Sequence, residues 1–134
     1  MTTDDLLMEA VARATCPSRP AGAVLHCVSP EVEFVGYEGA PHGLPHCEVV
    51  GCRVIDGVGC VNAVPAEVNA LLRAARSGVS TLGATLEVSM SLDPLTAGAI
   101  VNAGVAKVVC HGPVARGVRA MLELAAVQVE ERDD

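Results

Sequence analysis

The fold of this chain is decided by residues 84–131, which read ATLEVSM (84–90), SLDPLTAGAIVNAG (91–104), VAKVVC (105–110), HGPVARGVRAMLELAA (111–126) and VQVEE (127–131). The first, third and fifth runs are short and rich in Val and Leu, which is typical of buried strands. The two longer runs have helical spacing of apolar residues, and Asp93-Pro94 is a helix-start signal. Strands that alternate with helices predict a largely parallel sheet with helices on both faces.

The residues before this region predict a helix and a hairpin. Apolar residues at helical spacing follow an acidic first turn over 4–14, and Pro17 ends that helix. Two β-prone runs, 21–28 and 32–36, flank a turn at Ser29-Pro30. We therefore expect an amphipathic helix that leads into two antiparallel strands.

The middle of the chain combines a second amphipathic helix with a long irregular segment. Pro65 begins the helix and Gly78 ends it, with apolar residues at i, i+3, i+4 and i+7 in between. Residues 37–64 are rich in Gly, Pro, His and Cys and have no clear period. We expect a Cys-rich loop there that needs something to hold it, inside one domain that spans residues 1–134.

The composition narrows the classes of partner. The 9 basic and 16 acidic residues give a net charge of −7, the wrong sign for binding nucleic acid. No run approaches the roughly 20 apolar residues of a membrane-spanning helix, so we expect no membrane partner. The acidic N-terminus does not resemble a secretory signal, which predicts a cytoplasmic protein whose six cysteines are thiols or metal ligands.

Five segments, taken together and in order, resemble the zinc-dependent cytidine and deoxycytidylate deaminases. They are GYEGAP (36–41), GLPHC (43–47), AEVNALL (66–72), GATL (83–86) and IVNAGV (100–105). The deoxycytidylate branch is the more similar one, because it has a GYNGxP turn and a cysteine-bearing insertion before its catalytic helix. The resemblance implies an α/β fold, a three-layer α/β/α sandwich with a mixed five-stranded sheet, and a homo-oligomer.

The resemblance also implies that the catalytic zinc ligands are replaced. The family binds zinc through an H-A-E helix start and a P-C-x-x-C segment, and the Glu moves protons. Here the first position reads Pro65-Ala66-Glu67, and Asp93 and Thr96 stand in the second. Pro has no donor atom and Thr is a poor zinc ligand. Of this machinery only Glu67 is retained.

Several expected substrate contacts differ as well. Glu38 replaces the Asn of the family's turn, and Glu87 stands where a Tyr is common. The chain has only two aromatic residues, so rings that would stack on a pyrimidine are missing. We expect Glu38, Glu67 and Asp93 to surround one acidic pocket. We also expect Glu38, Glu87, Thr96 and His111 to bind its ligand, with His111 placed at the carboxyl end of a strand.

A separate, structural zinc site is predicted from four cysteines. The resemblance places Cys16 and Cys47 at structural zinc positions, and Cys52 and Cys60 lie in the insertion. Four thiolates complete a tetrahedral site, one zinc per chain, that would order the loop. Two alternatives remain at this point: His46 as a substitute ligand, or four free thiols.

Two main functions follow, and a third is weaker. The first is a metal-independent enzyme of hydrolase, isomerase or lyase type, with Glu67 as general acid/base and with Asp93 and Glu38 as its partners on a small neutral or cationic molecule. The second is a non-catalytic ligand-binding or partner subunit, in which Glu67 only suits the helix dipole and Asp93 is an N-cap. The third is a deaminase with an atypical metal site.

Overall fold

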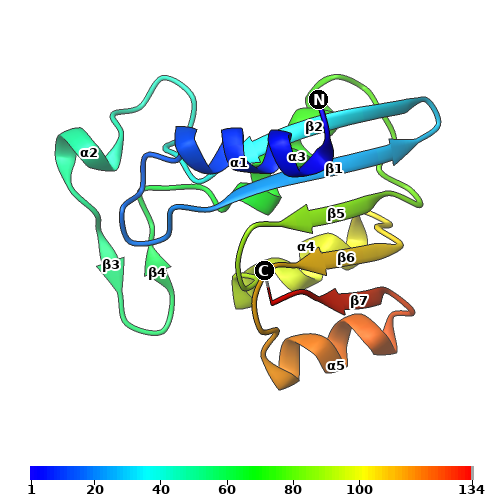
Figure 1. Cartoon of the computed structure of the whole chain (residues 1–134). Coiled ribbons are helices and arrows are strands. Elements are labelled where there is room, and N and C mark those ends of the chain that lie inside the picture. The colour runs from blue at the N-terminus through cyan, green and yellow to red at the C-terminus, as the bar shows by residue number, and fades with distance from the viewer. Residues whose placement is uncertain (134) are drawn as a thin grey trace.

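The computed structural model describes residues 1–133, and its centre is one five-stranded mixed sheet (Figure 1). The strands lie in the order β2 (Glu31–Tyr37), β1 (Gly22–Val28), β5 (Thr85–Val88), β6 (Lys107–Cys110) and β7 (Gln128–Glu131). The strand β1 pairs antiparallel with β2 and β5, whereas β5, β6 and β7 run parallel. The predicted α/β class with a mixed five-stranded sheet is confirmed.

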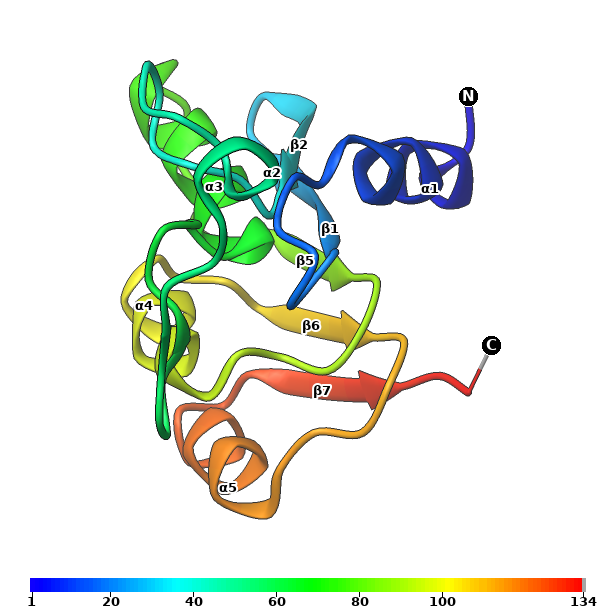
Figure 2. The ribbon, with the colours of Figure 1, turned by 90° about the vertical axis from the view of Figure 1, so that its left-hand side faces the viewer.

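Helices flank the sheet on both sides (Figure 2). The first helix, α1 (Thr3–Arg13), lies on one side, next to β1 and β2. The other side carries α3 (Ala66–Arg76), α4 (Ala97–Asn102) and α5 (Arg116–Leu124). Between these three helices and the sheet lies the main apolar core, which includes Leu25, Leu86, Val108, Ile100 and Leu122.

Small residues let α3 lie directly on the sheet. A side chain at Gly36 of β2 would place its Cβ atom 2.3 Å from the carbonyl oxygen of Ala66 and 2.5 Å from the amide nitrogen of Ala70. Only a residue without a Cβ atom permits that approach. Because the first turn of α3 is held against β2, Glu67 in that turn is completely buried.

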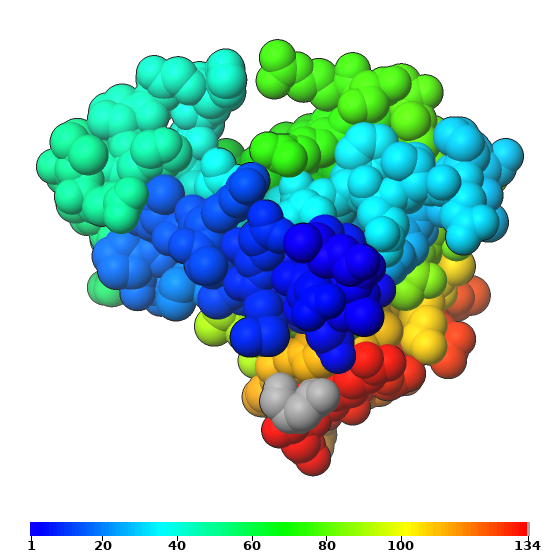
Figure 3. All heavy atoms as spheres, turned by 45° about the horizontal axis from the view of Figure 1, so that its top comes forward, coloured from blue at the N-terminus to red at the C-terminus, as the bar shows by residue number. Residues whose placement is uncertain are grey.

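The Cys-rich segment is more regular than expected. It contains a short helix, α2 (Cys47–Val50), and a two-stranded hairpin of β3 (Val54–Ile55) and β4 (Gly59–Cys60). Figure 3 shows residues 40–60 as a lobe at the edge of the molecule. The prediction of a loop without secondary structure was therefore wrong in part, because elements of two to four residues are too short to produce a periodic pattern.

The predicted helix after Asp93 is also divided. A 3₁₀ turn, η1 (Pro94–Thr96), precedes α4. None of the helices described over residues 1–133 is long and apolar enough to cross a membrane.

Candidate functional site

A half-buried arginine, Arg19, lies between the acidic residues of the predicted pocket. Arg19, in the segment between α1 and β1, directs its guanidinium at both carboxylate oxygens of Glu67, with two nitrogen–oxygen distances of 3.1 Å. The same group donates to Glu38 Oε1 at 2.7 Å and to the Ser91 carbonyl oxygen at 2.9 Å. Sequence reasoning did not single out Arg19, because no motif marks it.

Glu67 is enclosed on every side by donors. Besides Arg19, its Oε2 atom accepts hydrogen bonds from the backbone N–H of Asp93 at 3.0 Å and from the hydroxyl of Thr96 at 3.2 Å. The side chain has no exposed surface. Arg19 lines the adjacent cavity and Glu67 does not.

Glu38 completes the charged group at the start of α3. Its Oε1 accepts the backbone N–H of Ala66 at 2.7 Å in addition to Arg19. Burial raises the pKa of Glu38 to about 7, although Arg19 and the Ala66 N–H favour the ionised form. Glu38 therefore titrates near neutral pH.

Asp93 has a local structural role as well as a place beside the pocket. Its carboxylate accepts the backbone N–H of Leu95 at 2.9 Å and so caps η1. This confirms the N-cap interpretation. A cavity of about 430 Å³ opens in front of this group, with Arg19, Glu38 and Asp93 in its lining and residues of the β3–β4 hairpin opposite. Neither Glu67 nor Thr96 is in the lining.

Two of the predicted ligand-binding residues lie elsewhere. His111 Nε2 and Glu87 Oε2 are 2.6 Å apart, and a carboxylate oxygen of Asp4 in α1 is within 4.8 Å of both ligand atoms. Side chains alternate along a strand, and Leu86 and Val88 on either side of Glu87 face the core under α3 and α4. Glu87 therefore points to the α1 side. The pair Glu87–His111 does not join the group around Glu67.

The positions that the resemblance equates with catalytic zinc ligands, Pro65, Asp93 and Thr96, have other contacts in this structure. Pro65 has no side-chain donor, the Thr96 hydroxyl donates to Glu67, and Asp93 caps η1. Two clusters of three or more possible metal ligands occur in the described part of the chain, and neither includes Glu38, Glu67 or Asp93. A guanidinium fills the space between these groups instead.

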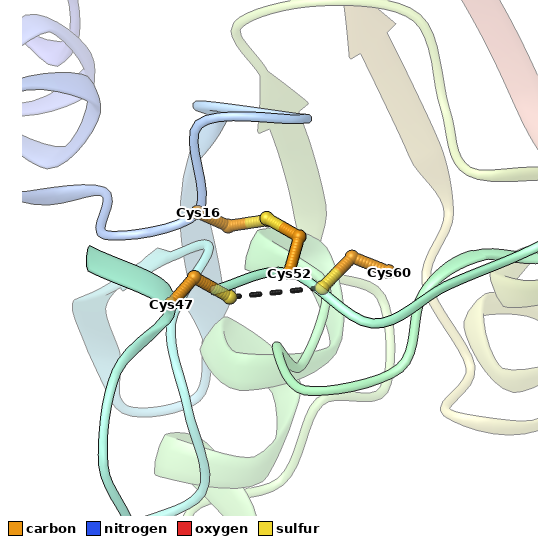
Figure 4. Close-up of side chains that lie close together, drawn as sticks. All are labelled: Cys16, Cys47, Cys52 and Cys60. Atoms are coloured by element: carbon orange, nitrogen blue, oxygen red, sulfur yellow. Dashed lines mark hydrogen bonds between the residues drawn. The ribbon is translucent and has the colours of Figure 1, made fainter. Parts of the chain in front are cut away.

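The four predicted structural ligands do come together (Figure 4). Cys16 follows α1, Cys47 begins α2, Cys52 follows α2, and Cys60 ends β4; their sulfur atoms all lie within 4.8 Å of one another. The Cys16–Cys52 and Cys47–Cys60 sulfur distances are 3.8 and 3.6 Å. In a tetrahedron with Zn–S bonds of about 2.3 Å, neighbouring sulfurs are about 3.8 Å apart. The cluster therefore fits a zinc ion.

The cysteines of the cluster shift one another's pKa values in opposite directions. Burial and the neighbouring thiols raise the pKa of Cys47 well above its usual value. Burial also acts to raise the pKa of Cys60, but hydrogen bonds from the backbone of Asn62 and Arg53 and from other thiols outweigh it and lower that pKa to about 7. His46 is not in the cluster: its Nδ1 is 3.0 Å from the Thr15 hydroxyl.

Three comparisons with known proteins agree with this architecture. ComE operon protein 2 of Bacillus subtilis (strain 168) is 36% identical over 77 residues, which cover 58% of this chain and 40% of that protein. The dCMP deaminase of cyanophage S-TIM5, solved in complex with dCMP and dUMP, superposes with a TM-score of 0.77 and 25% identity over 98% of each chain. A Thermotoga maritima diaminohydroxyphosphoribosylaminopyrimidine deaminase/reductase shares the fold, with a TM-score of 0.62 and 19% identity over 96% of this chain and 34% of the other.

The chain thus spans about two fifths of the length of its curated relative. A match of that extent does not show that this chain has the relative's activity. Residues 3–112 match the family described as the cytidine and deoxycytidylate deaminase zinc-binding region. That match covers most of the chain, and the fold agrees with it. This protein belongs to the cytidine and deoxycytidylate deaminase family.

Proposed function

We propose that this protein is a non-catalytic member of its family, a ligand-binding or partner subunit that does not deaminate nucleotides. One observation carries the proposal: the Arg19 guanidinium forms a two-point salt bridge with Glu67, at 3.1 Å on each carboxylate oxygen, and Glu67 is completely buried.

The metal-ligand positions support the same proposal. A catalytic zinc normally takes three protein ligands and an open position for water. Pro65, Asp93 and Thr96 supply no such set here, and the positive charge of Arg19 would repel a dication. We infer that zinc-activated water is not formed beside Glu67.

The contacts of Glu67 also weigh against its use as a general acid or base. A general base must come within hydrogen-bond reach of the proton that it removes. The four hydrogen bonds that Glu67 accepts, and its complete burial, leave a ligand no direct approach. The metal-independent enzyme with Glu67 at its centre is therefore less well supported than the binding protein.

A structural zinc belongs to the proposal. The cysteine cluster joins the segment after α1 to both ends of the Cys-rich lobe, so that one zinc ion would hold three separate parts of the chain together. Homo-oligomer formation stays a prediction from the resemblance.

One observation favours a second candidate. Glu38 and Asp93 both line the 430 Å³ cavity, and the pKa of Glu38 is about 7, the range in which a carboxyl exchanges protons at neutral pH. An acid/base enzyme built on Glu38, with Asp93 as its partner, would act on a small neutral or cationic molecule.

The test is ammonia release from dCMP and deoxycytidine by zinc-loaded protein. We expect no turnover by the wild type. Zinc-dependent turnover that disappears in Glu67→Gln would overturn the proposal and restore the deaminase function. The second candidate is tested with a panel of small amines and amides, on which Glu38→Gln must abolish any activity that the wild type shows.

A further inference from the structure

We propose that the Arg19 side chain takes the place of a catalytic metal ion as the pocket's cation, and that the four oxygens around it form a binding site for a planar guanidinium or amidinium group. In the intact chain that group is Arg19 itself. The inference rests on the proposed function, because it assumes that no catalytic zinc competes for the same place.

The charges require a cation at this position. The side chains of Glu67 and Glu38 are 0% and 5% exposed, and that of Arg19 is 17% exposed. A carboxylate withdrawn from water is stable only when it is paired or hydrogen-bonded. Arg19 is the basic residue that contacts both carboxylates in the described part of the chain, and both raise its pKa, which outweighs the opposite effect of burial.

The geometry selects a planar cation with several N–H groups. Nη1 donates to Glu67 Oε1 and Glu38 Oε1, while Nη2 donates to Glu67 Oε2 and the Ser91 carbonyl oxygen. A guanidinium presents its donors in one fixed fork that matches a carboxylate in two places. A lysine ammonium is a compact point charge, and it cannot span both Glu67 oxygens and Ser91 in the same way.

The segment that carries Arg19 has internal hydrogen bonds and two prolines that restrict its backbone. The backbone N–H of Arg19 donates to the Cys16 carbonyl oxygen at 3.3 Å, and the Cys16 sulfur lies 3.0 Å from the Ser18 hydroxyl. Pro17 and Pro20 restrict the same segment. A tethered group has a high effective concentration, so a free ligand competes poorly with it.

The experiment is thermal unfolding of the zinc-loaded full chain and its Arg19→Ala variant, each with and without methylguanidinium chloride. We expect Arg19→Ala to lower Tm by on the order of 10 °C, because two buried carboxylates lose their partner. About 10 mM methylguanidinium should then raise the Tm of Arg19→Ala by roughly 3 °C. The Tm of the wild type should not change, because its own guanidinium already occupies the site.

Two controls identify the site and the chemistry. In Arg19→Ala/Glu67→Gln, methylguanidinium should stabilise far less than in Arg19→Ala, because the two-point pairing with Glu67 is gone and only Glu38 and the Ser91 carbonyl oxygen remain. Tetramethylammonium has the same charge without N–H donors, and it should not stabilise Arg19→Ala. Equal stabilisation by tetramethylammonium, by calcium or by magnesium would overturn the proposal, as would an unchanged Tm for Arg19→Ala.

If Arg19→Ala does not fold, a double variant without the charges of Arg19 and Glu67 tests the proposal instead. Arg19→Met/Glu67→Gln keeps the volume of both side chains and should unfold at a higher temperature than Arg19→Met alone. A double variant that is no more stable than Arg19→Met contradicts the proposal. These results are independent of turnover: wild-type deamination refutes the proposed function, whereas the Tm series refutes the role of Arg19.

Discussion

The pocket around Arg19 and the cysteine cluster differ in where the cation for their buried polar groups comes from. In the pocket, the protein's own guanidinium neutralises Glu38 and Glu67 and satisfies their oxygens. In the cluster, four cysteine sulfur atoms lie within 4.8 Å of one another. The same short segment serves both, because Cys16 and Arg19 are three residues apart. In our proposal the first site has its cation in Arg19, whereas the second takes its cation from a bound zinc ion.

Removal of the metal from the cysteine cluster should have the largest effect. Cys47→Ser should abolish zinc binding, remove hydrogen-exchange protection from residues 45–62 and lower the free energy of unfolding by more than about 5 kcal/mol, since zinc binding and folding are coupled. Native mass spectrometry measures the zinc content, hydrogen exchange measures the protection, and chemical denaturation measures the free energy of unfolding. The matched control is Cys27→Ala, a buried cysteine outside the cluster, which should keep about one zinc per chain. Full zinc content in Cys47→Ser would contradict the assignment.

Loss of one charge in the pocket should have the second-largest effect on stability. Glu67→Gln removes the charge that pairs with the half-buried Arg19, and we expect it to lower the free energy of unfolding by about 3 kcal/mol in chemical denaturation. Zinc content should not change. Glu123→Gln removes an exposed carboxylate that also pairs with an arginine, and it should cost under about 0.5 kcal/mol. Equal losses of unfolding free energy in the two variants would show that the salt bridge in the pocket stabilises the fold no more than an exposed one.

The titration of Glu38 should change the free energy of unfolding by as much as Glu67→Gln does, or by less. The folded state keeps a proton on Glu38 up to a pKa of about 7, whereas the unfolded chain loses it near 4.5. Between these values the folded state binds more protons, so stability falls as pH rises and levels off above pH 7. The wild type should lose at most about 3 kcal/mol relative to Glu38→Gln across this window. A constant difference between the two proteins from pH 4 to 8 would argue against the raised pKa.

The smallest effect should come from the cap. Asp93→Ala removes the hydrogen bond to the Leu95 N–H and should cost about 1 kcal/mol. Because Asp93 is outside the cysteine cluster, zinc content should stay at one per chain. A loss of zinc in this variant would place a metal beside Glu67, and it would favour the deaminase function over the non-catalytic one.

Local patterns predicted most of the fold and part of the site. The alternation of strands and helices over residues 84–131 is a short-range property, and the structure has the same elements with small shifts of their ends. The positions of Glu38, Glu67, Asp93 and Thr96 around one place followed from the family resemblance, and the structure brings them together. Glu87 and His111 lie on the α1 side instead, because the strand's alternation turns Glu87 away from the core.

The sequence by itself determined which residue types were available: an apolar pattern for an α/β sheet, four cysteines in or before an irregular segment, and Pro65, Asp93 and Thr96 at the positions that the resemblance equates with zinc ligands. Only the tertiary structure decided the state of the pocket. Arg19 is separated by 19, 48 and 72 residues from Glu38, Glu67 and Ser91, and no local period or motif connects them. A buried charge is stabilised by whatever cation the fold brings within about 3 Å of it, and that choice is made by the packing of distant segments.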